Sequence, residues 1–328
     1  MVHNLPVASA LRAWFPEAHI DWVVEEAFTA IVRLHPAVRH IVPVAVRRWR
    51  HSLFSAATWK DVAAWRRDLR REGYDLVLDS QGLIKSGLIT LQTRLAPGGL
   101  RQGYAAEAAR EPLAARCYDR GLGIPKGVHA VERNLWLAAA ACARTPDARV
   151  DYGIAAPPLQ ASWLPSAPYA LLLTASSRTD KAWPDADWLA LAAQLKARGL
   201  ALLLPAATAA DRHHAARLAA RIGSAAMVAP PLDLDAIAGL CAGARLVIGV
   251  DTGLTHLATA LRRPTLCLFT GSDPTLTGVY PGSAALSGAG PDAKAHLAAL
   301  ARNLGRRGEP PQAEAVAAAA VALLGDAP

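Results

Sequence analysis

The stretch Arg245-Leu-Val-Ile-Gly-Val-Asp-Thr-Gly-Leu-Thr-His256 constrains the fold of this 328-residue chain more than any other. Five of the six residues before Asp251 are apolar or glycine, which predicts a buried strand of a parallel sheet. The chain is then expected to turn through Gly253 and enter a helix at Thr255 or His256. Open α/β sheets bind ligands at such strand ends, and helix N-termini attract anions such as phosphate.

The same turn also has a purely structural interpretation. Thr255 could be the N-cap of the helix, with Asp251 and Gly253 shaping a tight turn. Asp-Thr-Gly occurs in aspartic proteases as well, but those are all-β proteins that need two such carboxylates. This chain has one Asp-Thr-Gly among alternating strands and helices. The protease interpretation is therefore excluded, and the structural one stays open.

Strands and helices alternate through both halves of the chain. In the first half, strands are predicted at 19–24, 39–44 and 74–79, with helices at 6–14, 27–34, 59–72, 83–95 and 130–143. In the second half, strands are predicted at 169–173, 201–204, 226–228, 245–250 and 265–269, with helices at 187–198, 210–222, 234–242 and from about 255. Four prolines within 151–168 mark a boundary. The pattern predicts an α/β protein with two doubly wound, Rossmann-like domains facing a cleft.

Composition excludes several classes of protein. The chain is 52% hydrophobic and 19% charged, so it is globular and not disordered. Its four cysteines lie far apart without a Cys-x-x-Cys, which disfavours a disulfide framework or a zinc site and suits a reducing cytoplasm. No apolar stretch approaches the roughly 20 residues of a membrane helix, and the apolar segment 315–324 is expected to be a packed terminal helix. We expect no signal peptide.

Basic residues are concentrated in the first half. Residues 1–150 hold 21 Lys and Arg against 14 Asp and Glu, whereas residues 151–328 hold 14 against 13. The excess gathers at 47–50, predicted to be a loop, and in the four arginines of 66–71. A basic surface attracts nucleic acid, anionic lipid or an acidic substrate. For the second cluster a solvated helix face is the favoured explanation, because Asp68 and Glu72 are interleaved with it.

Two further strand ends of the second half carry polar residues. After 169–173 come Ser176, Ser177 and Lys181, and hydroxyls with a lysine suit a phosphate where no metal is held, although each is also an ordinary loop residue. After 265–269 comes Thr270-Gly-Ser-Asp-Pro274. The chain has no Gly-x-Gly-x-x-Gly and no Gly-Lys-Ser/Thr, so neither a dinucleotide site nor a P-loop is indicated.

A set of motifs, in order from Met1 to about Tyr280, resembles lipopolysaccharide heptosyltransferase I of glycosyltransferase family 9. The motifs are Asp21-Trp-Val-Val-Glu-Glu26, Ile41-Val-Pro-Val-Ala-Val-Arg-Arg-Trp-Arg50, Asp79-Ser-Gln-Gly-Leu-Ile-Lys-Ser86, Ala109-Arg-Glu-Pro-Leu-Ala114, His129-Ala-Val-Glu-Arg133, Asp180-Lys-Ala-Trp-Pro184 and Val250-Asp-Thr-Gly-Leu-Thr-His-Leu257. Several of these motifs are long, so the resemblance is specific.

The resemblance implies a GT-B fold, with an acceptor-binding domain at 1–155 and an ADP-heptose-binding domain at 156–328. In such a fold the last helix can pack back on the acceptor-binding domain. It implies inverting transfer of L-glycero-D-manno-heptose from ADP-heptose to the Kdo of Kdo2-lipid A, in lipopolysaccharide inner-core biosynthesis. It further implies no cofactor, no metal, no nucleic-acid partner and a peripheral location on the cytoplasmic face of the inner membrane. The alternatives are heptosyltransferase II, which uses a heptose acceptor, and a catalytically dead sugar-nucleotide-binding remnant.

The resemblance also assigns residues. The diphosphate would be held by Ser176, Ser177 and Lys181, and contacted by Thr252 and Gly253. Asp251 would bind heptose hydroxyls and His256 would line the same pocket, which makes Lys181 and Asp251 the catalytic pair. Asp211 falls where the family has a ribose-binding glutamate, although Ala206 and Ala207 replace the usual Trp-Gly beside it. The residues implied to face the acceptor are Arg47, Arg48, Arg50, Lys85 and Arg110.

The beginning of the chain departs from the family pattern. Family members open with a strand and a Gly-Asp loop, and that aspartate is the favoured general base. Here Met1 stands directly after the place of that aspartate, and the loss of a base typically costs about 10²–10⁴-fold in rate. We expect that the natural protein starts about a dozen residues earlier; the alternative is that this chain is weakened or inactive. Asp79, Glu25 and Glu26 also follow predicted strands, but turn and helix-start roles explain them equally well.

Overall fold

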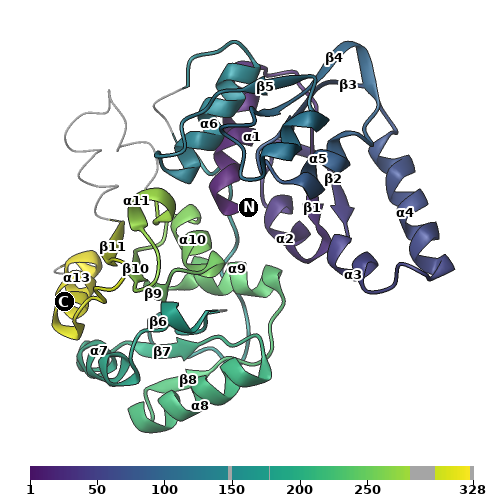
Figure 1. Cartoon of the computed structure of the whole chain (residues 1–328). Coiled ribbons are helices and arrows are strands. Elements are labelled where there is room, and N and C mark those ends of the chain that lie inside the picture. The colour runs from purple at the N-terminus through teal and green to yellow at the C-terminus, as the bar shows by residue number, and fades with distance from the viewer. Residues whose placement is uncertain (147–149, 177, 281–299, 326–328) are drawn as a thin grey trace. The chain divides into compact units, whose positions relative to one another are not determined.

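The computed structural model describes residues 1–146, 150–176, 178–280 and 300–325 (Figure 1). The chain forms two compact units, one holding Met1 and His3–Asp147 and the other Val2 and Ala148–Pro328. Residues just before the predicted boundary belong to the second unit, where the Tyr152 hydroxyl donates to the Tyr280 carbonyl at 3.1 Å. Each unit is therefore described by itself.

The N-terminal unit is an α/β unit in which every strand pairing is parallel. Its helices are η1 (Val2–Asn4), α1 (Leu5–Trp14), η2 (Glu26–Phe28), α2 (Thr29–Arg33), α3 (Val46–Arg50), α4 (Ala56–Leu69), α5 (Ile84–Thr90), η3 (Pro112–Cys117) and α6 (Ala130–Ala141). Its strands are β1 (Ile20–Glu25), β2 (Val38–Val44), β3 (Tyr74–Asp79), β4 (Leu95–Tyr104) and β5 (Arg120–Leu122). Parallel pairing agrees with the predicted βαβ order.

The strands of this unit form two separate sheets, β1–β2 and β3–β4–β5. Among the described residues no strand joins β1 to β3, so the single doubly wound sheet predicted for this half is present as two parallel pieces. A side-chain contact links the pieces near their starts, because the Tyr74 hydroxyl donates to Asp21 at 3.1 Å. Helix α1, opened by a proline in its first turn, packs against α6 and buries Leu5 and Val7.

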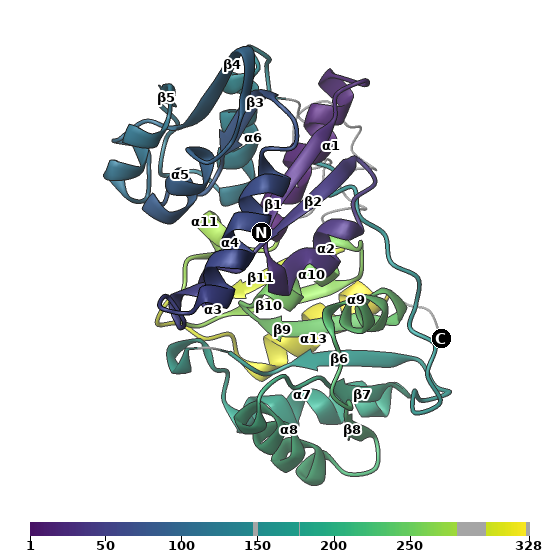
Figure 2. The ribbon, with the colours of Figure 1, turned by 90° about the vertical axis from the view of Figure 1, so that its right-hand side faces the viewer.

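The C-terminal unit is built around one parallel sheet of six strands in the order β11-β10-β9-β6-β7-β8 (Figure 2). The strands are β6 (Tyr169–Leu173), β7 (Ala201–Leu204), β8 (Ala226–Val228), β9 (Leu246–Val250), β10 (Thr265–Phe269) and β11 (Ala301–Gly305). The helices are η4 (Thr179–Lys181), α7 (Asp185–Ala197), α8 (Ala209–Ile222), α9 (Leu234–Gly243), α10 (Gly253–Ala260), α11 (Pro274–Thr277) and α13 (Ala313–Leu324).

The core of this unit explains the apolar strand runs. Every residue of β6, β9 and β10 is buried, as expected for strands covered by helices on both faces. Trp188 of α7 is fully buried in the same cluster as Val316 of α13. Helix α13 packs on α7 and on strands of its own unit, and packing against the N-terminal half stays a prediction. None of the described helices is long and apolar enough to cross a membrane.

Candidate functional site

The polar residues of the C-terminal unit converge at the carboxyl ends of three neighbouring strands. β6, β9 and β10 are adjacent in the sheet, and each ends in one of the three polar segments singled out in the sequence. Lys181 and Asp251 are 70 residues apart in the chain and Ser272 is a further 21 residues on, yet all three meet at one sheet edge, where open α/β sheets bind ligands.

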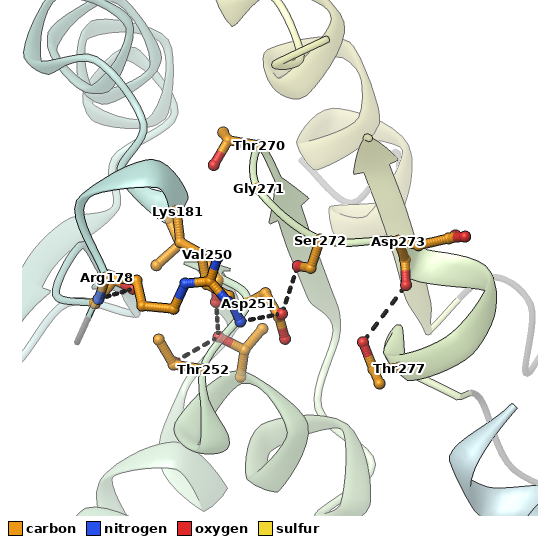
Figure 3. A network of polar contacts seen from close by, with 12 residues as sticks. Arg178, Lys181, Val250, Asp251, Thr252, Thr270, Gly271, Ser272, Asp273 and Thr277 are labelled. Carbon is orange, nitrogen blue, oxygen red and sulfur yellow. Dashed lines mark hydrogen bonds and ion pairs between the residues drawn. The ribbon is translucent and has the colours of Figure 1, made fainter. Parts of the chain in front are cut away.

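Asp251 is the centre of this cluster (Figure 3). Its Oδ2 accepts hydrogen bonds from Lys181 Nζ at 2.6 Å and from Ser272 Oγ at 2.6 Å. Its Oδ1 lies 3.0 Å from His256 Nε2. The Asp251 side chain is 9% exposed and that of Lys181 is 19% exposed, so both charges are largely desolvated. One carboxylate thus joins all three strand ends.

The surroundings of Asp251 favour its ionised form. Burial by itself raises the pKa of a carboxyl, but hydrogen bonds from His256, Lys181 and Ser272 outweigh it and hold the pKa of Asp251 well below its usual range. The carboxylate is therefore charged at neutral pH. It can accept further hydrogen bonds from a polyol, and the lysine beside it supplies a positive charge for an anion.

The loops after β6 and β10 are tied to each other. Thr270 Oγ1 donates to the Asp180 carbonyl at 2.7 Å, and a Cβ on Gly271 would lie 2.7 Å from that same oxygen. Asp180 in turn accepts from Arg178 Nε at 2.9 Å. The close approach requires glycine at 271 and fixes the backbone that carries Lys181 against the backbone that carries Ser272.

Helix α10 presents an N-terminus without a side-chain cap. It begins at Gly253 and not at Thr255 or His256, and its N-cap residue Thr252 makes no capping hydrogen bond. The Thr255 hydroxyl points back to the Val250 carbonyl at 2.7 Å, so the N-cap role considered for Thr255 is wrong. A Cβ on Gly253 would have no heavy atom within 4 Å. Open space beside an uncapped helix N-terminus and a lysine is suited to a phosphate group.

Of the other residues predicted for the donor site in this unit, Ser176 and Asp211 make hydrogen bonds within their own loop or helix start. Ser176 Oγ accepts the Arg178 N–H at 3.2 Å within the loop that carries Lys181, and Ser177 lies outside the described residues. Asp211 is engaged locally, because it and Thr208 form a reciprocal capping box at the start of α8 with both hydrogen bonds at 3.1 Å. Ser272 was not among the predicted site residues, although its position just after β10 on the same sheet edge was a usable signal.

The predicted acceptor residues come from separate parts of the N-terminal unit. Lys85 and Arg110 are exposed and lie on segments joined through Glu111, whose carboxylate accepts the Ile84 N–H at 2.6 Å and whose N–H donates to the Gly82 carbonyl at 3.0 Å. No described residue forms an ion pair with either. The structure thus brings these two cations to neighbouring segments.

The arginines at 47–50 form helix α3, and not the predicted loop, because the backbone continues from Ala45 into helical hydrogen bonds. Arg48 is bound by Glu26 at 3.2 Å and by Asp61 at 2.7 Å, and the pKa of its guanidinium is raised by the hydrogen bonds to Glu26 and then Asp61. Arg47 lies 5.9 Å from the Phe28 ring centroid, and Arg50 has no ion pair within the described residues. Arg48 is therefore neutralised locally, whereas neither Arg47 nor Arg50 forms an ion pair within the described residues.

Three carboxylates at strand ends of this unit have structural partners. Asp79 Oδ2 accepts from the Tyr118 hydroxyl at 2.7 Å, and its Oδ1 accepts the Gln81 N–H at 2.8 Å. Glu25 accepts the Arg47 N–H at 3.1 Å, and Glu26 binds Arg48. These contacts support the turn and helix-start interpretation for all three.

The family model for glycosyltransferase family 9 (heptosyltransferase) matches residues 62–302. The chain belongs to glycosyltransferase family 9. It is 41% identical over 281 residues to lipopolysaccharide heptosyltransferase 1 of Pseudomonas aeruginosa, covering 85% of this chain and 78% of that protein. It is 40% identical to lipopolysaccharide heptosyltransferase 1 of Escherichia coli K12, covering 85% and 87%. Both relatives are transferases, as this family 9 member is.

Solved structures of the family have the same fold. The E. coli heptosyltransferase WaaC with ADP superposes with a TM-score of 0.77 at 37% identity, covering 85% of this chain and 86% of that one. WaaC with ADP-2-deoxy-2-fluoro heptose gives a TM-score of 0.75 at 34% identity, covering 97% and 93%. The family 9 member described here is thus an α/β glycosyltransferase of the GT-B class, as predicted. The relatives' bound nucleotides support a nucleotide-sugar donor.

Proposed function

We propose that this chain transfers L-glycero-D-manno-heptose from ADP-heptose to the Kdo of Kdo2-lipid A, with inversion at the anomeric carbon. The observation that carries the proposal is the contact of Lys181 with Asp251 beside the uncapped N-terminus of α10. A cation and backbone N–H groups suit a diphosphate, and a desolvated carboxylate suits the hydroxyls of a sugar. The named relatives and their ligands are consistent with that donor.

In the proposed reaction the acceptor hydroxyl attacks the anomeric carbon from the face opposite to ADP and gives up its proton to a base or to solvent water. The bond between that carbon and the diphosphate oxygen breaks, and negative charge develops on the departing ADP. Lys181, the hydroxyls of Ser176, Ser177 and Thr252 and the N–H of Gly253 would stabilise that charge, as preorganised electrostatics require. Asp251 and His256 would hold the heptose, and Asp211 would reach the ribose only if it leaves its capping box.

We place the reaction at the cytoplasmic face of the inner membrane, where Kdo2-lipid A carries carboxylates and phosphates. The basic excess of residues 1–150 supports an acidic acceptor. Arg47, Arg50, Lys85 and Arg110 would face that acceptor, since all four are exposed and none has an ion pair within the described residues. Arg48 would have to exchange Glu26 and Asp61 for the acceptor.

An acceptor comparison tests this proposal. Purified protein is given ADP-heptose with Kdo2-lipid A in one reaction and with the same lipid already carrying one heptose in another, and ADP release is followed. Release with Kdo2-lipid A alone is expected. Release with the heptosylated lipid alone would identify the second heptosyltransferase activity. ADP-heptose binding without release in either reaction would identify a binding remnant.

A further inference from the structure

An apolar tip stands out on the surface of the N-terminal unit where α3 leads into α4, at the lower right of that unit in Figure 1. Phe54 is 104% exposed, Trp59 is 59% exposed and Leu53 is 51% exposed. These three are the most exposed large apolar side chains that the structure describes between α3 and the first turn of α4, and all lie within seven residues of sequence. A cluster of this kind on a soluble surface indicates a binding surface.

The tip is held in place by polar and aromatic contacts. Trp59 Nε1 donates to the Leu53 carbonyl at 2.8 Å, and Ser52 Oγ lies 2.8 Å from Thr58 Oγ1. Behind them, the rings of Trp49 on α3 and Trp65 on α4 pack edge to face with centroids 5.6 Å apart. The fold therefore fixes the backbone of the tip while it leaves the Phe54 side chain in solvent.

Positive charge surrounds the tip. Arg50 and Lys60 flank it, are exposed, and have no ion pair within the described residues. Trp59 and Lys60 share one face of α4 with Arg66 and Arg67, because Trp59 and Arg66, like Lys60 and Arg67, are seven residues apart, which is about two helical turns. Arg66 and Arg67 are also exposed and without an ion pair among the residues described. One face of α4 thus combines an aromatic end with a row of uncompensated cations.

The acids interleaved with this row do not neutralise it. Both carboxylate oxygens of Asp68 lie 3.1 Å from His40 Nε2, and Glu72 binds Arg39 at 2.8 Å. Asp61 binds Arg48 on α3. Asp61, Asp68 and Glu72 therefore form no ion pair with Arg66 or Arg67, although Glu72 also lies 3.9 Å from Arg71.

We propose that the tip formed by Leu53, Phe54 and Trp59, together with Arg50, Lys60, Arg66 and Arg67, docks on an anionic lipid bilayer. Exposed aromatic and leucine side chains enter the boundary between headgroups and acyl chains, and flanking cations bind lipid phosphates. The inference extends the proposed function, since an acceptor embedded in a membrane has to be reached from its surface. It does not depend on heptose transfer, because it concerns lipid without acceptor.

The test is co-sedimentation of the full chain with vesicles that contain no acceptor, made of phosphatidylcholine with or without phosphatidylglycerol. Binding to the anionic vesicles that weakens at high salt is expected, with little binding to phosphatidylcholine alone. The double variant Leu53→Ser/Phe54→Ser should bind at least about tenfold more weakly. Arg66→Glu/Arg67→Glu should also lose about tenfold at low salt.

Matched controls separate docking from general effects. Arg217→Glu/Arg221→Glu makes the same charge change on exposed positions of α8, and Leu100→Ser removes an apolar side chain that is 40% exposed on β4. Both controls should bind vesicles as the unaltered protein does, and all variants should still bind ADP. Equal binding by the tip variants and the unaltered protein, or no binding to anionic vesicles at all, would overturn the proposal whatever the transferase assay shows.

Discussion

Lys181 Nζ donates to Asp251 Oδ2 at 2.6 Å, across 70 residues of sequence. Under the proposed function, the cation assigned to the departing diphosphate and the carboxylate assigned to the sugar are hydrogen-bonded to each other. In that proposal, donor binding divides this pair between two parts of one substrate. The hydrogen bond from Lys181 is one of those that hold the pKa of the largely desolvated Asp251 carboxyl below its usual range.

Lys181→Ala should lower kcat/KM for the transfer by about 10²–10³-fold, because it removes the positive charge next to the developing charge on ADP. Steady-state ADP release measures this. Lys196→Ala, a change at an exposed lysine of α7 in the same unit, is the matched control and should have little effect. Unchanged turnover in Lys181→Ala would rule out the role given to this lysine.

Ser272→Ala should weaken ADP-heptose binding by about tenfold, because the hydroxyl that donates to Asp251 at 2.6 Å helps to fix the carboxylate. Affinity for ADP alone should change less, since Asp251 is assigned to the sugar. Calorimetric titration with both ligands measures the difference. Thr275→Ala removes a hydroxyl that donates to Asp273 on the next turn and should leave both affinities intact. Equal losses for the two ligands would argue against the assignment.

Asp251 should also make the stability of the protein depend on acidic pH. Its folded-state pKa lies below the ordinary value of 3.8, so the unfolded chain takes up the proton first as pH falls. The stabilisation is complete above about pH 5 and decreases as pH falls through 3.8 towards the folded-state pKa. Asp251→Asn should flatten the fall in thermal midpoint below about pH 5, whereas Asp187→Asn, at a carboxyl with no described partner, should keep it. An unchanged slope in Asp251→Asn would contradict the cause given for the shift.

The proposed ribose-binding role of Asp211 can be tested by comparing variants of Asp211 with variants of Thr208, its partner in the capping box of α8. Asp211→Ala and Thr208→Ala each break the capping box of α8 and should destabilise the protein by about 0.5–2 kcal/mol. If Asp211 only caps the helix, the two variants should bind ADP alike. If it also binds the ribose, Asp211→Ala should bind ADP more weakly than Thr208→Ala, and isothermal titration distinguishes the two results. We expect the second result, in line with the resemblance.

Much of the fold follows from local patterns in the sequence. The predicted strands at 74–79, 169–173, 201–204, 226–228 and 265–269 coincide with β3, β6, β7, β8 and β10, because short apolar runs bounded by turn residues admit few alternatives. β4 was missed, since Pro97, Gly98 and Gly99 interrupt its pattern and its pairing with β3 shifts register there. β5 and β11 were also missed, because edge strands with mixed polarity lack a periodic signal.

The donor site was predictable in part. Because open α/β sheets bind ligands at the carboxyl ends of their strands, the sequence was enough to identify the three polar strand ends. It could not show that Asp251 joins them through Lys181, His256 and Ser272. Such pairings depend on side-chain positions across long sequence distances. Nor could spacing show that Asp68 and Glu72 contact His40 and Arg39, because these partners lie far away in the sequence.

Mass spectrometry of Kdo2-lipid A after incubation with this chain and ADP-heptose tests the central proposal most directly. The account predicts that the lipid gains the mass of one heptose, with one ADP released for each heptose added, and that Lys181→Ala abolishes most of this gain. Lipid of unchanged mass in the presence of protein that binds ADP-heptose would contradict the account and leave donor binding as the function of this chain.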